Sequence, residues 1–375
     1  MHEIFELILS QLFMATHKSS KITVAFMLLL VLNTFSSFAQ LDTDEVVDES
    51  FNPTEMIMHH ISDSHGWHFF GEGEDSFTIP LPVILWTDEG VVSFMSSAFH
   101  HDVEGEHVVE AGGQKFVNYH EKIFVLNEGE TELEYNEEEH VALNANSPFD
   151  ISITKNVASM LLTSILMIIL FMGLAKHYRK SKKAPKGFTN ILETLVVFVR
   201  DEIAKPQIGE KKYMKFMPFL LTVFFFIWIA NLMGLLPGAA NVTGNISITV
   251  ALGLFTLALI LVNANKDYWQ HVFWMPGIPT FVKPILAIVE ILGVFIKPIA
   301  LMIRLFANIT AGHIIILSLI GLIFILETAG VAAISVPFAL FITVLELLVA
   351  FLQAFIFTML SALFIGMAVQ EHEHH

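Results

Sequence analysis

The chain contains no cysteine among its 375 residues, and only 15% of the residues are charged. The missing cysteine excludes disulfides, thiolate nucleophiles and iron–sulfur clusters. About a quarter of the residues in an average soluble domain are charged, whereas 54% of this chain is hydrophobic. Because long apolar runs crowd the last two thirds of the chain, the composition indicates a membrane protein.

Positive charge is also scarce, since 20 Lys and Arg stand against 37 Asp and Glu, a formal net charge of −17. Such an excess of negative charge excludes a surface that binds nucleic acid. The sequence also lacks the glycine-rich phosphate loop of nucleotide-binding enzymes. We therefore expect a lipid-embedded protein that carries out no nucleotide chemistry itself, and we expect it to hold neither cofactor nor metal.

The charges are unevenly distributed along the chain. Residues 40 to 150 contain 25 Asp and Glu against two Lys, whereas residues 176 to 215 contain 11 of the 20 Lys and Arg. The positive-inside rule places the basic stretch in the cytoplasm. Between the two lies one uncharged span, residues 156 to 175. We therefore expect an acidic extracytoplasmic segment over residues 40 to 150 and a membrane domain over residues 151 to 375.

Residues 1 to 39 have the features of a secretory signal peptide. Lys18 and Lys21 precede an apolar run, and Ser37 and Ala39 supply small residues before a cleavage site at Gln40. Counted from Met14 the leader has 26 residues, the usual length, so we expect translation to start there. An uncleaved membrane anchor is the alternative.

Four further spans are expected, at residues 216–236, 246–262, 285–326 and 333–369. As helices the last two would be about 63 and 55 Å long at 1.5 Å per residue, whereas the hydrocarbon core is roughly 30 Å thick. Neither contains a polar turn. We therefore predict a hairpin of two long, tilted helices joined by a loop near residues 327 to 335.

Residues 188 to 205 show helical periodicity interrupted by charges, which is typical of an amphipathic helix on the cytoplasmic membrane face. The predicted fold class is thus an all-α polytopic membrane protein. It has five transmembrane helices, a cytoplasmic amphipathic helix and an acidic outer N-terminal segment.

Within the two long apolar runs stand Lys297, Arg304, Asn308, His313, Glu346 and Gln353. An ionisable group at a helix centre costs about 2.5 kcal/mol or more, and such groups pair, face water or move ions. Lys297 adjoins Pro298 and is expected to extend toward the membrane interface. A static ion pair is the structural alternative for Arg304.

Depth in the hairpin favours an ion path. In an antiparallel hairpin, two residues at the same depth have residue numbers that add up to the same total. The numbers of Arg304 and Gln353 add up to 657, and those of His313 and Glu346 to 659. Each of these pairs is therefore expected to share a depth. At 100° per residue, Arg304 and His313 point to opposite faces of their helix. A fixed cation near a titratable imidazole suits a proton path past an electrostatic barrier better than a single salt bridge.

These residues lie in motifs that resemble the a subunit of F-type ATP synthases. The motifs are ALMIRLFANI at residues 300–309 with AGH at 311–313, FIWIANLMGLLP at 226–237 and LQAFIF at 352–357. The resemblance covers roughly residues 150 to 370. Met302 departs from the family's usual small residue, so we expect the local fit to the rotor to differ.

The resemblance implies a non-catalytic stator subunit in a bacterial inner membrane that carries protons to and from the carboxylates of a c-subunit ring. The b-subunit peripheral stalk and the remaining synthase subunits would be its partners. Arg304 would separate two half-channels, with Asn308 and Gln353 as its hydrogen-bonding partners. His313 and Glu346 would line the outer half-channel.

Glu290 would mark the cytoplasmic half-channel, because it lies about 21 Å inward from Arg304 along one helical face. The main alternative is a self-contained transporter or channel in which Arg304 and Glu290 bind a substrate at the midplane. Transporters of that kind often show internal repeats, and this sequence shows none. A receptor-like anchor would leave the charges in the spans unexplained.

The charge asymmetry generates a topology prediction. We expect residues 40 to 155 outside, residues 176 to 215 inside and His375 inside. The chain lacks cysteine, so a single Ser181→Cys substitution provides a unique label site. An impermeant thiol reagent should leave it unmodified in intact cells and should label a cysteine placed within residues 40 to 155. Labelling at position 181 would contradict the topology.

Overall fold

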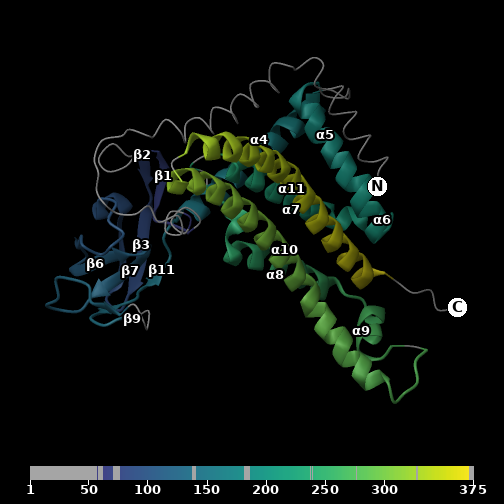
Figure 1. The fold of residues 1–375 in the computed structure, drawn as a ribbon. Helices are drawn as coiled ribbons and strands as arrows, with labels where there is room; N and C mark the ends of the chain where they lie inside the picture. The colour runs from purple at the N-terminus through teal and green to yellow at the C-terminus, as the bar shows by residue number, and fades with distance from the viewer. Residues whose placement is uncertain are drawn as a thin grey trace. The chain divides into compact units, whose positions relative to one another are not determined.

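The computed structural model describes residues 57, 62–70, 77–136, 141–180, 186–236, 238, 240–275, 277–326 and 328–370 (Figure 1). The predicted signal peptide lies outside these residues. Residues 316–344 belong to one compact unit, and the other described residues belong to a second. All contacts discussed below lie within the second unit, except one helix turn noted as local.

Eight α-helices follow one another after residue 154 in the described chain. They are α4 (Lys155–Lys180), α5 (Phe188–Phe198), α6 (Lys205–Ile208), α7 (Tyr213–Gly234), α8 (Ile246–Asn263), α9 (Lys266–Phe273), α10 (Lys283–Leu326) and α11 (Ala329–Val369). Five of them, α4, α7, α8, α10 and α11, are long and apolar enough to cross a membrane. The prediction of five membrane-spanning helices is confirmed in number, with helix ends within five residues of the predicted limits.

The two long helices are continuous through their prolines. α10 has 44 residues and includes Pro298, and α11 has 41 and includes Pro337. The predicted loop of residues 327 to 335 is wrong in extent, because α11 already begins at Ala329. Locally, the Thr328 carbonyl accepts the backbone N–H groups of Val331 and Ala332. No proline stands in this turn, so the helix starts as soon as its first carbonyl acceptor is available.

The amphipathic segment predicted at residues 188 to 205 is α5, a π-helical turn η3 (Val199–Ala204) and α6. It buries Leu192, Val199 and Ile203 against the helical core. On the other side Asp201 forms ion pairs of 2.7 Å with Arg200 and Lys205. The segment therefore presents one apolar face to the spans and one charged face away from them.

An aromatic cluster forms the core of the helical region. Phe224, Phe225 and Trp228 of α7 pack with Phe351 of α11 at ring-centroid distances of 5.3 to 6.3 Å. Leu301 and Leu305 of α10 are buried in the same core. Edge-to-face packing of large rings fixes α7 against α11, and the two leucines fix which face of α10 turns inward.

The ends of the helices gather in two groups. At one end the Val369 carbonyl of α11 accepts hydrogen bonds from Lys212, before α7, and from Asn265, before α9. At the other end the Asp63 carboxylate accepts the backbone N–H of Asn156 at 3.1 Å and the side chain of Asn245 at 3.5 Å. Helix starts and ends alternate between the two groups, as a chain that crosses a membrane repeatedly requires.

Residues 66 to 150 form strands, which the all-α prediction did not include. They are β1 (Gly66–Phe70), β2 (Phe77–Pro80), β3 (Pro82–Thr87), β4 (Gly90–Met95), β5 (Val109–Ala111), β6 (Gln114–Tyr119), β7 (Lys122–Leu126), β8 (Tyr135–Asn136), β9 (Val141–Ala142), β10 (Ala145–Asn146) and β11 (Phe149–Asp150). All pairings are antiparallel, in the orders β10-β7-β6-β5, β11-β3-β4, β1-β2 and β8-β9.

Two small apolar clusters explain why this acidic segment folds. Val83 and Leu85 of β3 pack against Phe116 of β6, while the adjacent Val117 packs on the opposite face with Phe124 of β7. Alternation along β3 buries every second residue. The acidic side chains are thereby left on the surface, and the strands bury enough apolar area to form a β domain (residues 66 to 150).

Gly366 of α11 generates a stability prediction. It is buried, and a Cβ built on it would overlap the carbonyl oxygen of Gln207 in α6 and lie 2.9 Å from the carbonyl carbon. Gly366→Ala should therefore push α6 away and cost about 1–3 kcal/mol, measured as a lower melting temperature of the purified complex. The control is Gly173→Ala in α4, where a Cβ meets nothing within 4 Å. Equal melting temperatures would contradict the predicted clash.

Candidate functional site

His313 and Glu346 meet inside the helical region. The Nδ1 atom of His313 in α10 lies 2.7 Å from Oε1 of Glu346 in α11, and the side chains are 19% and 3% exposed. The expectation that these two residues lie at one depth is thus confirmed. The bond satisfies two ionisable groups that would otherwise be costly within apolar helices.

The second ring nitrogen of His313 is bound as well. Nε2 lies 3.1 Å from the carbonyl oxygen of Gly234, the last residue of α7. A carbonyl can only accept, so Nε2 carries a hydrogen. The proton between Nδ1 and Glu346 Oε1 can then belong to either group without changing the net charge of the pair. The arrangement is chemically suited to proton exchange.

Glu346 reaches His313 because glycine precedes the histidine. A Cβ built on Gly312 would lie 2.8 Å from Oε1 of Glu346, which is closer than such contacts allow. The other carboxylate oxygen, Oε2, is buried and has no hydrogen-bond partner among the described residues. Neither Gly312 nor the Gly234 carbonyl was assigned a role from the sequence; the AGH motif was the available signal for Gly312.

Asn231 joins α7 to α11 near this pair. Its side-chain amide donates to the carbonyl of Ala350 at 3.3 Å and accepts the hydroxyl of Thr243. Thr243 belongs to a 3₁₀ turn, η4 (Val242–Gly244), in the connection between α7 and α8. The buried Asn231 amide therefore joins three elements: α7, to which it belongs, α11, and the connection between α7 and α8.

Arg304 lies on an exposed side of α10. Leu301 and Leu305 are buried, whereas Arg304 and Asn308 are exposed. Within the described residues, no hydrogen bond or ion pair joins Arg304 to another side chain. The expected hydrogen bonds from Asn308 and Gln353 are not observed, because Gln353 is 3% exposed in α11 while Arg304 points outward. A static ion pair for Arg304 is likewise not observed in this part of the chain.

The remaining polar positions of α10 face neighbouring helices. Glu290 is half-buried and close to Tyr268 of α9; burial and the carboxylate charge raise the pKa of Tyr268. The Lys297 ammonium lies 5.7 Å from the ring centroid of Phe364 in α11. Cation–π contact thus compensates this charge within the chain.

Met302 packs within the chain. A Cβ built on Gly253 of α8 would lie 3.5 Å from the Cβ and 3.7 Å from the sulfur of Met302. Glycine in α8 therefore accommodates the large side chain. The expectation that Met302 alters the fit to a rotor is not supported, since its side chain turns to α8 and away from the exposed face of Arg304.

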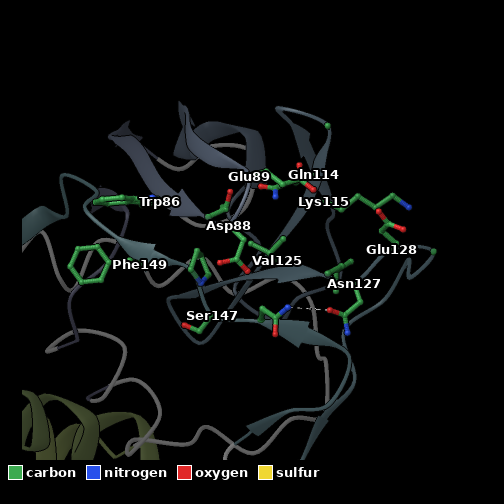
Figure 2. A pocket seen from close by; sticks show the side chains of 16 residues that line it. Trp86, Asp88, Glu89, Gln114, Lys115, Val125, Asn127, Glu128, Ser147 and Phe149 are labelled. Carbon is green, nitrogen blue, oxygen red and sulfur yellow. Dashed lines mark hydrogen bonds between the residues drawn. The ribbon is translucent and has the colours of Figure 1, made fainter.

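The β domain contains an open pocket of about 680 Å³ (Figure 2). Trp86 and Phe149, which are cross-strand neighbours, form one side and are 59% and 70% exposed. Asp88, Glu89 and Glu128 on its walls are also exposed. Its titratable groups are solvated, whereas the His313–Glu346 pair is buried, so the pair is the stronger candidate for ion chemistry.

The histidines of the β domain do not form a metal centre in the part that the structure describes. No group of three or more His, Cys, Asp or Glu residues there could hold a metal ion. His65 instead binds Asp150 of β11 through Nε2 at 2.8 Å. His59 and His60 lie outside the described residues.

Comparison with known proteins gives two family matches. Residues 157–366, more than half of the chain, match the ATP synthase A chain. Residues 56–151 match a domain of unknown function, DUF8433. The first match contains all the polar positions of α10 and α11 discussed above, and the second contains all the strands.

Individual relatives agree with the first match. ATP synthase subunit a of Chloroherpeton thalassium is 48% identical over 60% of this chain and 69% of its own. Subunit a 2 of Chlorobaculum tepidum is 50% identical over 60% and 66%. Subunit a 2 of Prosthecochloris aestuarii is 42% identical over 80% and 94%. The chain therefore belongs to the ATP synthase A chain family.

Proposed function

We propose that this member of the family carries protons between the two sides of a bacterial inner membrane and the carboxylates of a c-subunit ring. Residues 40 to 155 would lie outside and the C-terminus in the cytoplasm. The b-subunit stalk and the other synthase subunits would hold the chain still while the ring turns. The observation that carries the proposal is the buried contact between His313 and Glu346. His313 lies on α10, the helix that also exposes Arg304.

Arg304 would act as the separator between two half-channels. Its guanidinium is exposed on α10 and has no partner within the described chain, so its charge is available to a group on another subunit. A guanidinium stays protonated at any attainable pH. It would attract each passing ring carboxylate in its ionised form and repel a proton that would otherwise leak directly between the half-channels.

The face around Arg304 suits a protein partner. Ile303, which precedes Arg304 on α10, is an exposed large hydrophobic residue. An apolar face with one fixed cation complements a ring whose helices are apolar except for one carboxylate each. Asn308, on the same exposed face, and the buried Gln353 are the proposed hydrogen-bonding partners of Arg304 in the assembled synthase.

His313 and Glu346 would form the proton relay of the outer half-channel. The Gly234 carbonyl keeps a hydrogen on Nε2, and a proton passes between Nδ1 and Oε1. The unpaired Oε2 of Glu346 would hand the proton on. Glu290, about 21 Å from Arg304 along α10, would mark the cytoplasmic half-channel, where it lies near Tyr268 of α9.

A self-contained transporter is the weaker alternative. Such a protein would need Arg304 and Glu290 to meet at one midplane site, whereas they lie 14 residues apart on one continuous helix. The family match over residues 157–366 also favours the stator function.

The proposed role of Arg304 predicts that its substitution uncouples ATP synthesis from the ion gradient. Arg304→Ala should abolish ATP synthesis driven by an ion gradient, because nothing then separates the half-channels, while the complex still assembles. Arg304→Lys should also fail, since a point charge lacks the planar guanidinium fork. The measurement is ATP synthesis in vesicles together with the amount of assembled complex.

Ile303→Ala is the matched control, because Ile303 is an exposed, uncharged neighbour on the same helix. It should retain coupling. Normal ATP synthesis in either Arg304 variant would show that the charge has no separating role. Loss of assembly in both would show that the charge is structural.

A further inference from the structure

The connection between α7 and α8, residues 235 to 245, contacts the His313–Glu346 site from one side. It begins next to Gly234, whose carbonyl binds His313 Nε2 at 3.1 Å. Its Thr243 hydroxyl donates to the buried Asn231. The Cα of Asn241 lies 3.6 Å from the position that a Cβ on Gly234 would take. A shift of this connection would therefore move the carbonyl that orients the imidazole.

The β domain holds the same connection from the other side. Trp67 of β1, which is 9% exposed, donates its indole N–H to the carbonyl of Gly238 at 2.6 Å. Gly238 has a φ of +72°, in the left-handed region that favours glycine. A Cβ there would lie 2.9 Å from Cδ1 and 3.0 Å from Cα of Phe69. β1 thus lies directly against the middle of the connection.

Asp63, just before β1, holds the far end of the connection. Its carboxylate accepts the Asn245 side chain at 3.5 Å, the Thr154 hydroxyl at 2.9 Å and the Asn156 backbone N–H at 3.1 Å. Asn245 caps the first turn of α8 by accepting the N–H of Ser247. One carboxylate therefore ties the start of α4 to the start of α8.

β1 is itself anchored to the rest of the β domain. His65, immediately before β1, is buried and lies 2.8 Å from Asp150. Burial lowers the pKa of His65, but hydrogen bonds and charges from Asp150 and Glu121 outweigh it and raise the pKa to about 9. The histidine is therefore charged at neutral pH, and the contribution of its charge to the anchor is lost as the pH rises through about 9.

We propose that the β domain is a positioning element of the outer half-channel: through Trp67 and Asp63 it fixes the α7–α8 connection, so that the Gly234 carbonyl keeps the His313 imidazole aligned with Glu346. This proposal rests on the proposed function of His313 and Glu346 as the outer relay.

The chemistry depends on which ring nitrogen carries the fixed hydrogen. With Gly234 in place, Nε2 keeps its hydrogen and Nδ1 exchanges a proton with Glu346. If the carbonyl moves away, the neutral ring can hold its hydrogen on Nδ1 with Nε2 bare. The exchangeable proton is then no longer confined to the His313–Glu346 bond. Proton exchange between the pair and the outer side would slow, whereas steps on the cytoplasmic side would not change.

The test compares Trp67→Phe with Trp86→Phe in the whole complex. Phenylalanine keeps a ring at position 67 but removes the N–H that binds Gly238, whereas Trp86 is 59% exposed and lines the open pocket of the β domain. ATP-driven proton pumping is measured in inverted vesicles, whose lumen corresponds to the outer side. The luminal pH and the external pH are varied separately.

Trp67→Phe should slow pumping about three- to tenfold, the effect of one lost hydrogen bond. It should also shift the dependence on luminal pH while leaving the dependence on external pH unchanged. The charged group facing the His313 ring is Glu346 of α11, and α7 presents the neutral Gly234 carbonyl. Gly238→Ala, which pushes Phe69 and β1 away from the connection, should produce the same one-sided shift.

The proposal is overturned if Trp67→Phe behaves like Trp86→Phe, or if it slows pumping without any change in the luminal pH profile. Loss of assembly in both Trp67→Phe and Gly238→Ala would also overturn it, because the contact would then serve folding alone. The Arg304→Ala variant distinguishes a failure of the proposed function from a failure of the proposed role of the β domain. Normal pumping in Arg304→Ala refutes the proposed function, whereas abolished pumping with an inert Trp67→Phe refutes only the role of the β domain.

Discussion

The hydrogen bond between His313 and Glu346 is the interaction on which the helical site depends. Two ionisable side chains in apolar helices are costly unless each finds a partner, and here each partner comes from a different helix. The bond brings α10 and α11 together at one depth, and the Gly234 carbonyl adds the end of α7. Three helices thus meet where a proton can be shared without a change in net charge.

α10 separates two tasks by using its two faces. Leu301 and Leu305 pack into the aromatic core built from α7 and α11, which fixes the rotation of the helix about its axis. Arg304 and Asn308 are therefore turned outward. The Arg304 charge remains available to another subunit. His313, nine residues after Arg304 on α10, pairs with Glu346 inside the chain.

Much of this arrangement could be predicted because it follows from membrane physics. Hydrocarbon thickness sets the length of apolar runs, and the rise per residue sets which positions of a hairpin share a depth, hence His313 with Glu346. The strands were missed because they are two to six residues long and stand among acidic turns, although the short apolar run Pro82–Thr87 was an available signal. The contact of the Gly234 carbonyl with His313 could not be predicted, because every residue has a backbone carbonyl and the residue type does not show which one binds a side chain. The hydrogen bonds expected at Arg304 are not observed, because Leu301 and Leu305 occupy the core and the Arg304 side chain is left exposed.

The claim that His313 and Glu346 act as one relay is tested most directly by exchanging them. ATP-driven proton pumping is measured in inverted vesicles for single variants His313→Glu and Glu346→His and for the double exchange. Each single change leaves two like groups facing each other in a buried site and should slow pumping. The exchange keeps an imidazole and a carboxylate at one depth and should restore part of the rate. Losses that simply add in the double variant, as they do for independent sites, would contradict a shared proton path.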